Sequence, residues 1–110
     1  MKLHYSYHVL IERKERFTAI MTYLNYDIGC PIATQSADKI PNSRSCRKGV
    51  YQTLTSRGIM LIWDETTQEI LTIYAARMPQ AIAMYKQCTN CARLPQEVFY
   101  AIKDNEREGL

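Results

Sequence analysis

The sequence lacks most of the features that identify a membrane protein, an exported protein or a common class of enzyme. Its 110 residues contain no apolar run long enough to cross a bilayer, and its first residues lack the apolar stretch of a signal peptide. A glycine-rich phosphate loop and a serine-centred nucleophile elbow are also missing, and there are only two histidines. We therefore expect a cytoplasmic protein with no cofactor and no membrane partner.

The composition is that of an ordinary folded chain. Charged residues make up 23% and hydrophobic residues 46% of the sequence, which argues against a chain disordered throughout. The formal net charge of +3 permits a nucleic-acid partner without requiring one. The length predicts a single domain over residues 1–110.

Helical periodicity marks the first part of the chain. Apolar residues recur at steps of three, four and seven and predict a helix over about residues 7–24, with the stripe formed by Val9, Leu10, Phe17, Ile20, Met21 and Leu24. The following residues, 25–48, have no clear period, and we predict that they are irregular.

Three strands follow between residues 50 and 76. The segment 50–55 alternates in polarity, the apolar run 59–63 is typical of a central strand, and 69–76 alternates again. Two helices, about 79–88 and 95–106, begin at prolines that suit a first helical turn. The predicted fold is therefore α+β: an N-terminal helix, a three- to four-stranded antiparallel sheet and two C-terminal helices.

A polar face of this sheet is the first candidate site. Aromatic rings stack on bases, and hydroxyls and cations contact the phosphate backbone, so such a face suits RNA. The surface would consist of Tyr51, Thr53, Thr55, Thr72 and Tyr74, with Arg44, Arg47, Lys48 and Arg57 beside it. The alternative is that threonine and tyrosine are present only as good strand formers.

His8 is the second candidate, because an imidazole can exchange protons near neutral pH. Glu12 and Arg16 follow at four-residue steps and so lie on the same face of the predicted helix. Glu12 could orient the imidazole, while Arg16 or Arg13 could stabilise the charge of a phosphoryl transition state. The alternative is a solvated helix surface with a common Glu–Arg pair.

Four cysteines form the third candidate. Cys88 and Cys91 have the spacing of a zinc-ligand pair, and Cys30 with Cys46 could complete a tetrahedral site. Free thiols are the alternative that a reducing compartment favours.

The segment Ser6–Arg16, a strand pair containing Thr55-x-x-Gly58, and the segment 69–74 together carry a resemblance to a known family. They resemble the RelE-like endoribonucleases of the barnase, EndoU, colicin and RelE superfamily. Within that group, the phage messenger RNA endoribonuclease of the RegB type has a similar Ser-x-His helix.

The resemblance implies a toxin or a phage mRNA-processing factor, with a helix packed on an antiparallel sheet that holds RNA. It further implies metal-independent cleavage in which a 2′-hydroxyl attacks the adjacent phosphate. Under it, His8 matches the family's helical histidine, Arg13 or Arg16 its arginines, and Thr72 and Tyr74 its polar sheet positions. Such a protein could also have an antitoxin or a host target as a protein partner.

Two other functions stay open at this point. The eight tyrosines, one tryptophan and five methionines suit a protein-binding surface as well as RNA stacking. The chain could therefore be a non-catalytic phage or mobile-element accessory protein that binds and inhibits a host or defence protein. An RNA-binding module stabilised by zinc on all four cysteines is the other alternative.

Overall fold

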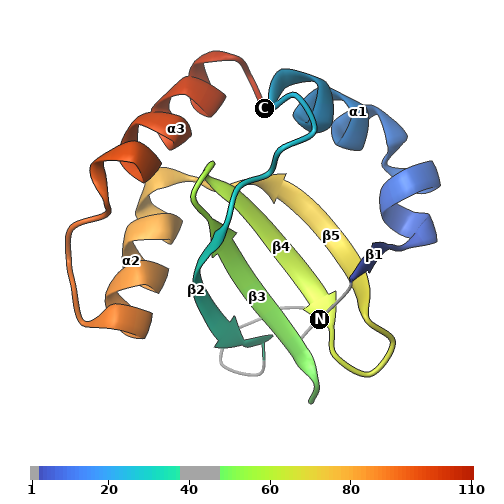
Figure 1. Cartoon of the computed structure of the whole chain (residues 1–110), viewed down its shortest axis with the longest axis horizontal. Coiled ribbons are helices and arrows are strands. Elements are labelled where there is room, and N and C mark those ends of the chain that lie inside the picture. Colours follow the sequence, from blue (N-terminus) through green and yellow to red (C-terminus); the bar gives the residue numbers. More distant parts are fainter. Residues whose placement is uncertain (1–2, 38–47) are drawn as a thin grey trace.

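The computed structural model of the chain describes residues 3–37 and 48–110. Figure 1 shows a twisted central sheet, with one helical segment beside β1 and β5 and two helices on the side of β2. In chain order the elements are β1 (His4–Tyr5), η1 (His8–Glu12), α1 (Lys14–Tyr23), β2 (Pro31–Ser36), β3 (Val50–Thr55), β4 (Ile59–Asp64), β5 (Glu69–Ala75), α2 (Met78–Thr89) and α3 (Gln96–Arg107).

The predicted meander forms the middle of the sheet. The strand order is β1-β5-β4-β3-β2, so the apolar strand β4 is central, as its composition indicated. Gly58 makes the β3–β4 turn possible with a φ of +76°, a region that glycine enters at little cost. At the β4–β5 turn the Asp64 carboxylate accepts a 2.8 Å hydrogen bond from the backbone N–H of Thr66. These local features explain why the three strands were visible in the sequence.

Two outer strands were not predicted. β2 lies within the segment 25–48 that we expected to be irregular, and it pairs antiparallel with β3. β1 pairs parallel with the start of β5, which makes the sheet five-stranded and mixed instead of purely antiparallel. Both pairings join residues that are distant in sequence, and a two-residue strand carries no detectable period.

The N-terminal helix also differs from the prediction of one helix over residues 7–24. Its first part, η1, is a π-helix in which the Arg13 N–H bonds to the His8 carbonyl at 2.8 Å. At Arg13 the backbone leaves helical geometry, with φ −117° and ψ 36°, and α1 then begins at Lys14. Because this hydrogen bond spans one residue more than in an α-helix, different side chains share a face in η1.

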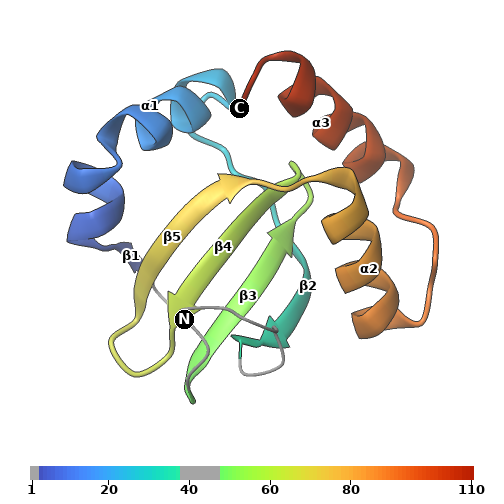
Figure 2. The ribbon, with the colours of Figure 1, turned by 180° about the vertical axis from the view of Figure 1, so that it is seen from behind.

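The two faces of the sheet have separate apolar cores. On the first, which we call the α1 face, Val9 and Ile20 pack against Leu61 and Ile73. On the second, the α2/α3 face, α2 and α3 pack against a core whose largest sheet residues are Leu54 and Met60. Figure 2 shows the sheet from behind, with α2 beside β2 and α3 running across the end of the sheet toward α1.

The C-terminal helices match their predicted positions within a residue. Pro79 stands in the first turn of α2, and Pro95 immediately precedes α3. The thiol of Cys88 in α2 approaches the carbonyl of Thr34 at 3.5 Å, so α2 covers the outer edge of β2. Within residues 3–37 and 48–110, no helix has the length and apolarity needed to cross a membrane.

Candidate functional site

His8 and Glu12 form a pair at the surface of η1. The His8 Nδ1 and Glu12 Oε1 atoms are 3.6 Å apart, which is ion-pair distance and longer than a hydrogen bond. The two side chains are 44% and 59% exposed. A carboxylate at this distance can orient the imidazole and balance its charge, and solvent or a ligand can reach the ring.

Basic side chains lie directly beyond this pair. An open depression of about 500 Å³ surrounds the break between η1 and α1, and three predicted site residues, Glu12, Arg13 and Arg16, line it. Lys14 and Glu15 line it as well. The structure therefore brings Glu12, Arg13 and Arg16 together around a helix break, and His8 joins them through its contact with Glu12.

An aromatic pair lies on the same face of the sheet as η1. Tyr51 on β3 and Trp63 on β4 are directly paired across the strands, and their rings stack with centroids 5.0 Å apart. Trp63 also packs against the core that contains Val9 of η1. The indole N–H donates a 2.8 Å hydrogen bond to the hydroxyl of Thr53, which fixes the orientation of the tryptophan ring.

The aromatic pair and η1 also lie at the same end of the sheet. Trp63 pairs with Ile70, and the Ile70 carbonyl accepts a hydrogen bond from the backbone N–H of Ser6, two residues before η1. The exposed Lys48 precedes β3 at this end too. η1 and the stacked rings thus lie on the same face and toward the same end of the sheet, and Lys48 precedes the strand that carries Tyr51.

Thr72 and Tyr74 lie on the opposite face, which corrects the predicted polar surface. Tyr74 pairs with Met60 and Thr72 with Ile62, whereas Tyr51 pairs with Trp63 on the other side of the sheet. The Tyr74 hydroxyl accepts hydrogen bonds of 3.0 Å from the side chains of both Gln52 and Gln80. Neither Thr72 nor Tyr74 can reach a substrate at His8, because the sheet itself separates them.

The two threonines that do share a face with Tyr51 are buried. Thr53 is 4% exposed and Thr55 is 1% exposed. The Thr53 hydroxyl accepts a hydrogen bond from the Trp63 indole N–H and is also hydrogen-bonded to the Thr34 hydroxyl. The Thr55 hydroxyl accepts a hydrogen bond from the backbone N–H of Ile59. These two threonines therefore stabilise the pairing of strands and turns. This agrees with the alternative that threonine is present in the sheet as a good strand former.

The predicted RNA-binding cations do not all lie in the same part of the structure. Arg57 lies at the opposite end of β3 from Lys48, and its guanidinium contacts the carboxylate of Asp27 at 3.9 Å. Arg44 and Arg47 lie outside the described residues. Of the predicted RNA-binding residues, Arg13 lines the depression beside Glu12. Tyr51 and Lys48 lie at the start of β3, and Arg57 lies beyond its other end.

The cysteines do not come together in the part of the chain that the structure describes. Cys30, Cys88 and Cys91 are free and exposed, and no three His, Cys, Asp or Glu side chains among the described residues are placed to hold a metal ion. The Cys91 thiol instead approaches the Arg93 carbonyl at 3.3 Å. Cys46, the fourth member of the suggested zinc site, lies outside the described residues.

The sequence analysis assigned neither Trp63 nor His4 to a candidate site. Trp63 ends an apolar run, so its partly exposed ring was read as part of a strand covered on both faces. His4 lies on β1, with its Nε2 atom 4.0 Å from Glu69 Oε2. The sheet therefore does carry a histidine, on a strand too short to be recognised from sequence.

Comparisons with known proteins found no match: no protein-family model, no curated protein and no solved structure resembles the chain above the significance threshold.

Proposed function

We propose that this protein binds RNA and cleaves it without a metal ion, at the His8–Glu12 pair. The observation that carries the proposal is the 3.6 Å contact between these two half-exposed side chains beside a depression lined by arginines. The stacked Tyr51 and Trp63 rings on the same face offer an aromatic surface for bases. π-Helical turns such as η1 are often found at functional sites.

The chemistry follows from the positions of these groups. The His8 Nδ1 atom faces Glu12, so Nε2 is the ring nitrogen that would accept the proton of a ribose 2′-hydroxyl. The 2′-oxygen then bonds to the adjacent phosphorus, and the bond to the 5′-oxygen breaks. Solvent protonates the leaving 5′-oxygen, and the products carry a 2′,3′-cyclic phosphate and a 5′-hydroxyl. Arg13 and Arg16 would stabilise the charge on the phosphoryl oxygens.

The test compares two histidines of the same chain. The purified protein is incubated with an end-labelled structured RNA in the presence of a metal chelator, and the cleaved ends are analysed. We expect 2′,3′-cyclic phosphate ends from the unmodified protein, and a rate lower by about 100-fold or more for His8→Ala, the usual loss on removal of a general base. The control is His4→Ala, since the His4 side chain is 64% exposed and outside the proposed site.

Three outcomes would contradict this proposal. One is the absence of cyclic phosphate ends, the second is an unchanged rate in His8→Ala, and the third is an equal loss in His4→Ala. A loss of cleavage on adding the chelator would reject only the metal-independent mechanism.

A second candidate is the non-catalytic function, in which the protein binds and inhibits another protein. The observation that favours it is the number of large hydrophobic side chains that remain exposed among the described residues. They lie in and beside η1, at the end of α1, and on α2 and α3, and comprise Tyr7, Leu10, Ile11, Tyr23, Tyr26, Ile82, Phe99 and Tyr100. Stoichiometric capture of one protein together with no RNA cleavage would favour this candidate over the first.

A further inference from the structure

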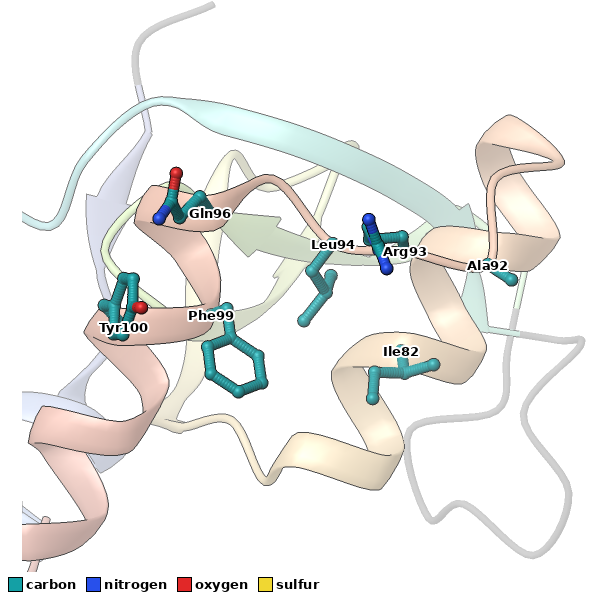
Figure 3. Close-up of a pocket in the computed structure, with 7 residues that line it drawn as sticks. All are labelled: Ile82, Ala92, Arg93, Leu94, Gln96, Phe99 and Tyr100. Carbon is teal, nitrogen blue, oxygen red and sulfur yellow. The ribbon is translucent and has the colours of Figure 1, made fainter.

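A second surface region lies between α2 and α3, on the outside of the molecule. It is an open depression of about 550 Å³, and Figure 3 shows its lining residues. Ile82 comes from α2 and Phe99 from α3, and both side chains point into the same space together with Leu94 from the connecting segment. We call this feature the α2–α3 groove.

The groove exposes more apolar surface than folding of this chain requires. Ile82 and Phe99 are each 36% exposed and Tyr100 is 54% exposed, whereas the neighbouring Val98 and Ile102 of α3 are fully buried against the sheet. α3 therefore has an inner apolar side that completes the core and an outer one that faces solvent. Contiguous apolar surface with a polar rim is typical of a protein-binding site.

The charges around the groove are of one sign. Arg93 lines it, and the Lys103 ammonium lies 5.5 Å from the centre of the Phe99 ring. Lys86 follows Ile82 by one turn on α2, a helix that contains no acidic residue. The rim of the groove is therefore basic.

The acidic residues of α3 face elsewhere. Glu97 and Asp104 line a different depression, on the side of α3 that faces α1. Asp104 is moreover paired with Arg107. Glu106, the third acidic residue of α3, lines another depression together with Arg77. Lys103 therefore lies beside the groove, and none of the three carboxylates of α3 lines it.

We propose that the α2–α3 groove binds an acidic amphipathic helix of another protein. Two helices that flank an apolar floor form the kind of groove into which the apolar face of a third helix docks. Acidic residues at the edges of that helix would meet Arg93, Lys86 and Lys103. This inference is independent of RNA cleavage, because the groove and His8 lie on opposite sides of the sheet.

The experiment uses the full chain and two synthetic helical peptides that share one leucine stripe. One peptide has glutamate at its flanking positions and the other has lysine, and binding is measured by fluorescence anisotropy. We expect the glutamate peptide to bind and the lysine peptide to bind at least about tenfold more weakly. The reason is that lysine at the flanking positions replaces attraction to the basic rim with repulsion. Phe99→Glu should abolish binding of the glutamate peptide.

Charge-reversal variants test the basic rim. The double variant Arg93→Glu with Lys103→Glu should weaken binding of the glutamate peptide by about tenfold or more and improve binding of the lysine peptide. The single variant Arg77→Glu is the control, because Arg77 is exposed at the start of α2 and lines a different depression. Circular dichroism of each variant shows whether the fold is retained.

Several results would overturn the inference. Equal binding of the two peptides, or an unchanged affinity in the double variant, would show that charge does not select the partner. A dimer of this chain that Phe99→Glu dissociates would assign the groove to a second copy. An RNA oligonucleotide whose binding is lost in Phe99→Glu would assign the groove to nucleic acid.

Discussion

At the residue scale, the structure separates side chains that the sequence placed together. Strict alternation along β5 would place Ile70, Thr72 and Tyr74 on one face. A register shift between Ile62 and Trp63 leaves Leu71 unpaired, so Ile70 packs on the α1 face while Thr72 and Tyr74 lie on the other. One additional residue in a strand reverses the direction of every side chain before it, which no alternation pattern reveals.

Tyr5 gives a pH-dependent prediction at the same scale. Its ring packs edge-on against Phe17 with centroids 4.8 Å apart, and burial raises the pKa of the Tyr5 phenol because it penalises the charged form. A raised pKa in the folded state stabilises the protein below the unfolded pKa of about 10, and this contribution is lost as the pH rises toward the folded pKa.

We therefore expect the unfolding free energy to fall more steeply in the unmodified protein than in Tyr5→Phe between about pH 9 and about pH 11. Urea denaturation at each pH measures the difference. Tyr26→Phe is the control, since Tyr26 is 73% exposed. Parallel pH profiles for the unmodified protein and Tyr5→Phe would contradict the expectation.

At the element scale, contacts with a turn of the sheet hold helix α3 in position. The β3–β4 turn lies directly under α3, where the Asn105 side chain, 1% exposed, donates a 2.9 Å hydrogen bond to the Arg57 carbonyl. The next residue, Gly58, is so close to α3 that an added Cβ would lie 2.8 Å from Ile102 Cγ1. The close approach of the Gly58 backbone to α3, together with the positive φ of Gly58, explains why glycine occupies this position.

Gly58→Ala should therefore lower the unfolding free energy by clearly more than the roughly 1–2 kcal/mol that a left-handed alanine costs alone. The control is Gly109→Ala, which has a similar φ of +75° but nothing within 4 Å of the added Cβ. Urea denaturation of the two variants separates backbone strain from steric clash. Equal losses would mean that α3 moves away from the turn at no cost.

At the scale of the whole molecule, the strand order sets which parts of the sheet are most stable. β4 is central and almost entirely buried, whereas β1 is a two-residue strand at one edge. The sheet therefore joins a meander of short connections to outer strands whose pairing depends on tertiary packing.

We expect native-state hydrogen exchange to follow this arrangement. Backbone amides of β4 should exchange most slowly, near the limit set by global unfolding, and those of β1 should exchange much faster through local opening. Exchange monitored by NMR resolves the two groups. Equal protection of β1 and β4 would show instead that η1 and the N-terminal strand unfold only with the whole sheet.

The sequence by itself determined the elements that depend on local order. The meander of β3, β4 and β5 and the helices α2 and α3 follow from alternation, glycine turns and prolines, and the expected α+β class is what the structure has. Helical spacing also placed His8, Glu12, Arg13 and Arg16 in one N-terminal segment, where the structure pairs His8 with Glu12 and lines one depression with the other three.

Only the tertiary structure decided the two outer strands, the π-helical turn and the face on which each residue lies. These features depend on pairing between distant segments and on the register of neighbouring strands, which no local pattern encodes. As a result His8 lies with Tyr51 and Trp63 on one face, and Tyr74 and Thr72 lie on the other. The groove between α2 and α3 likewise exists only because packing turns Val98 and Ile102 inward and leaves Phe99 outside.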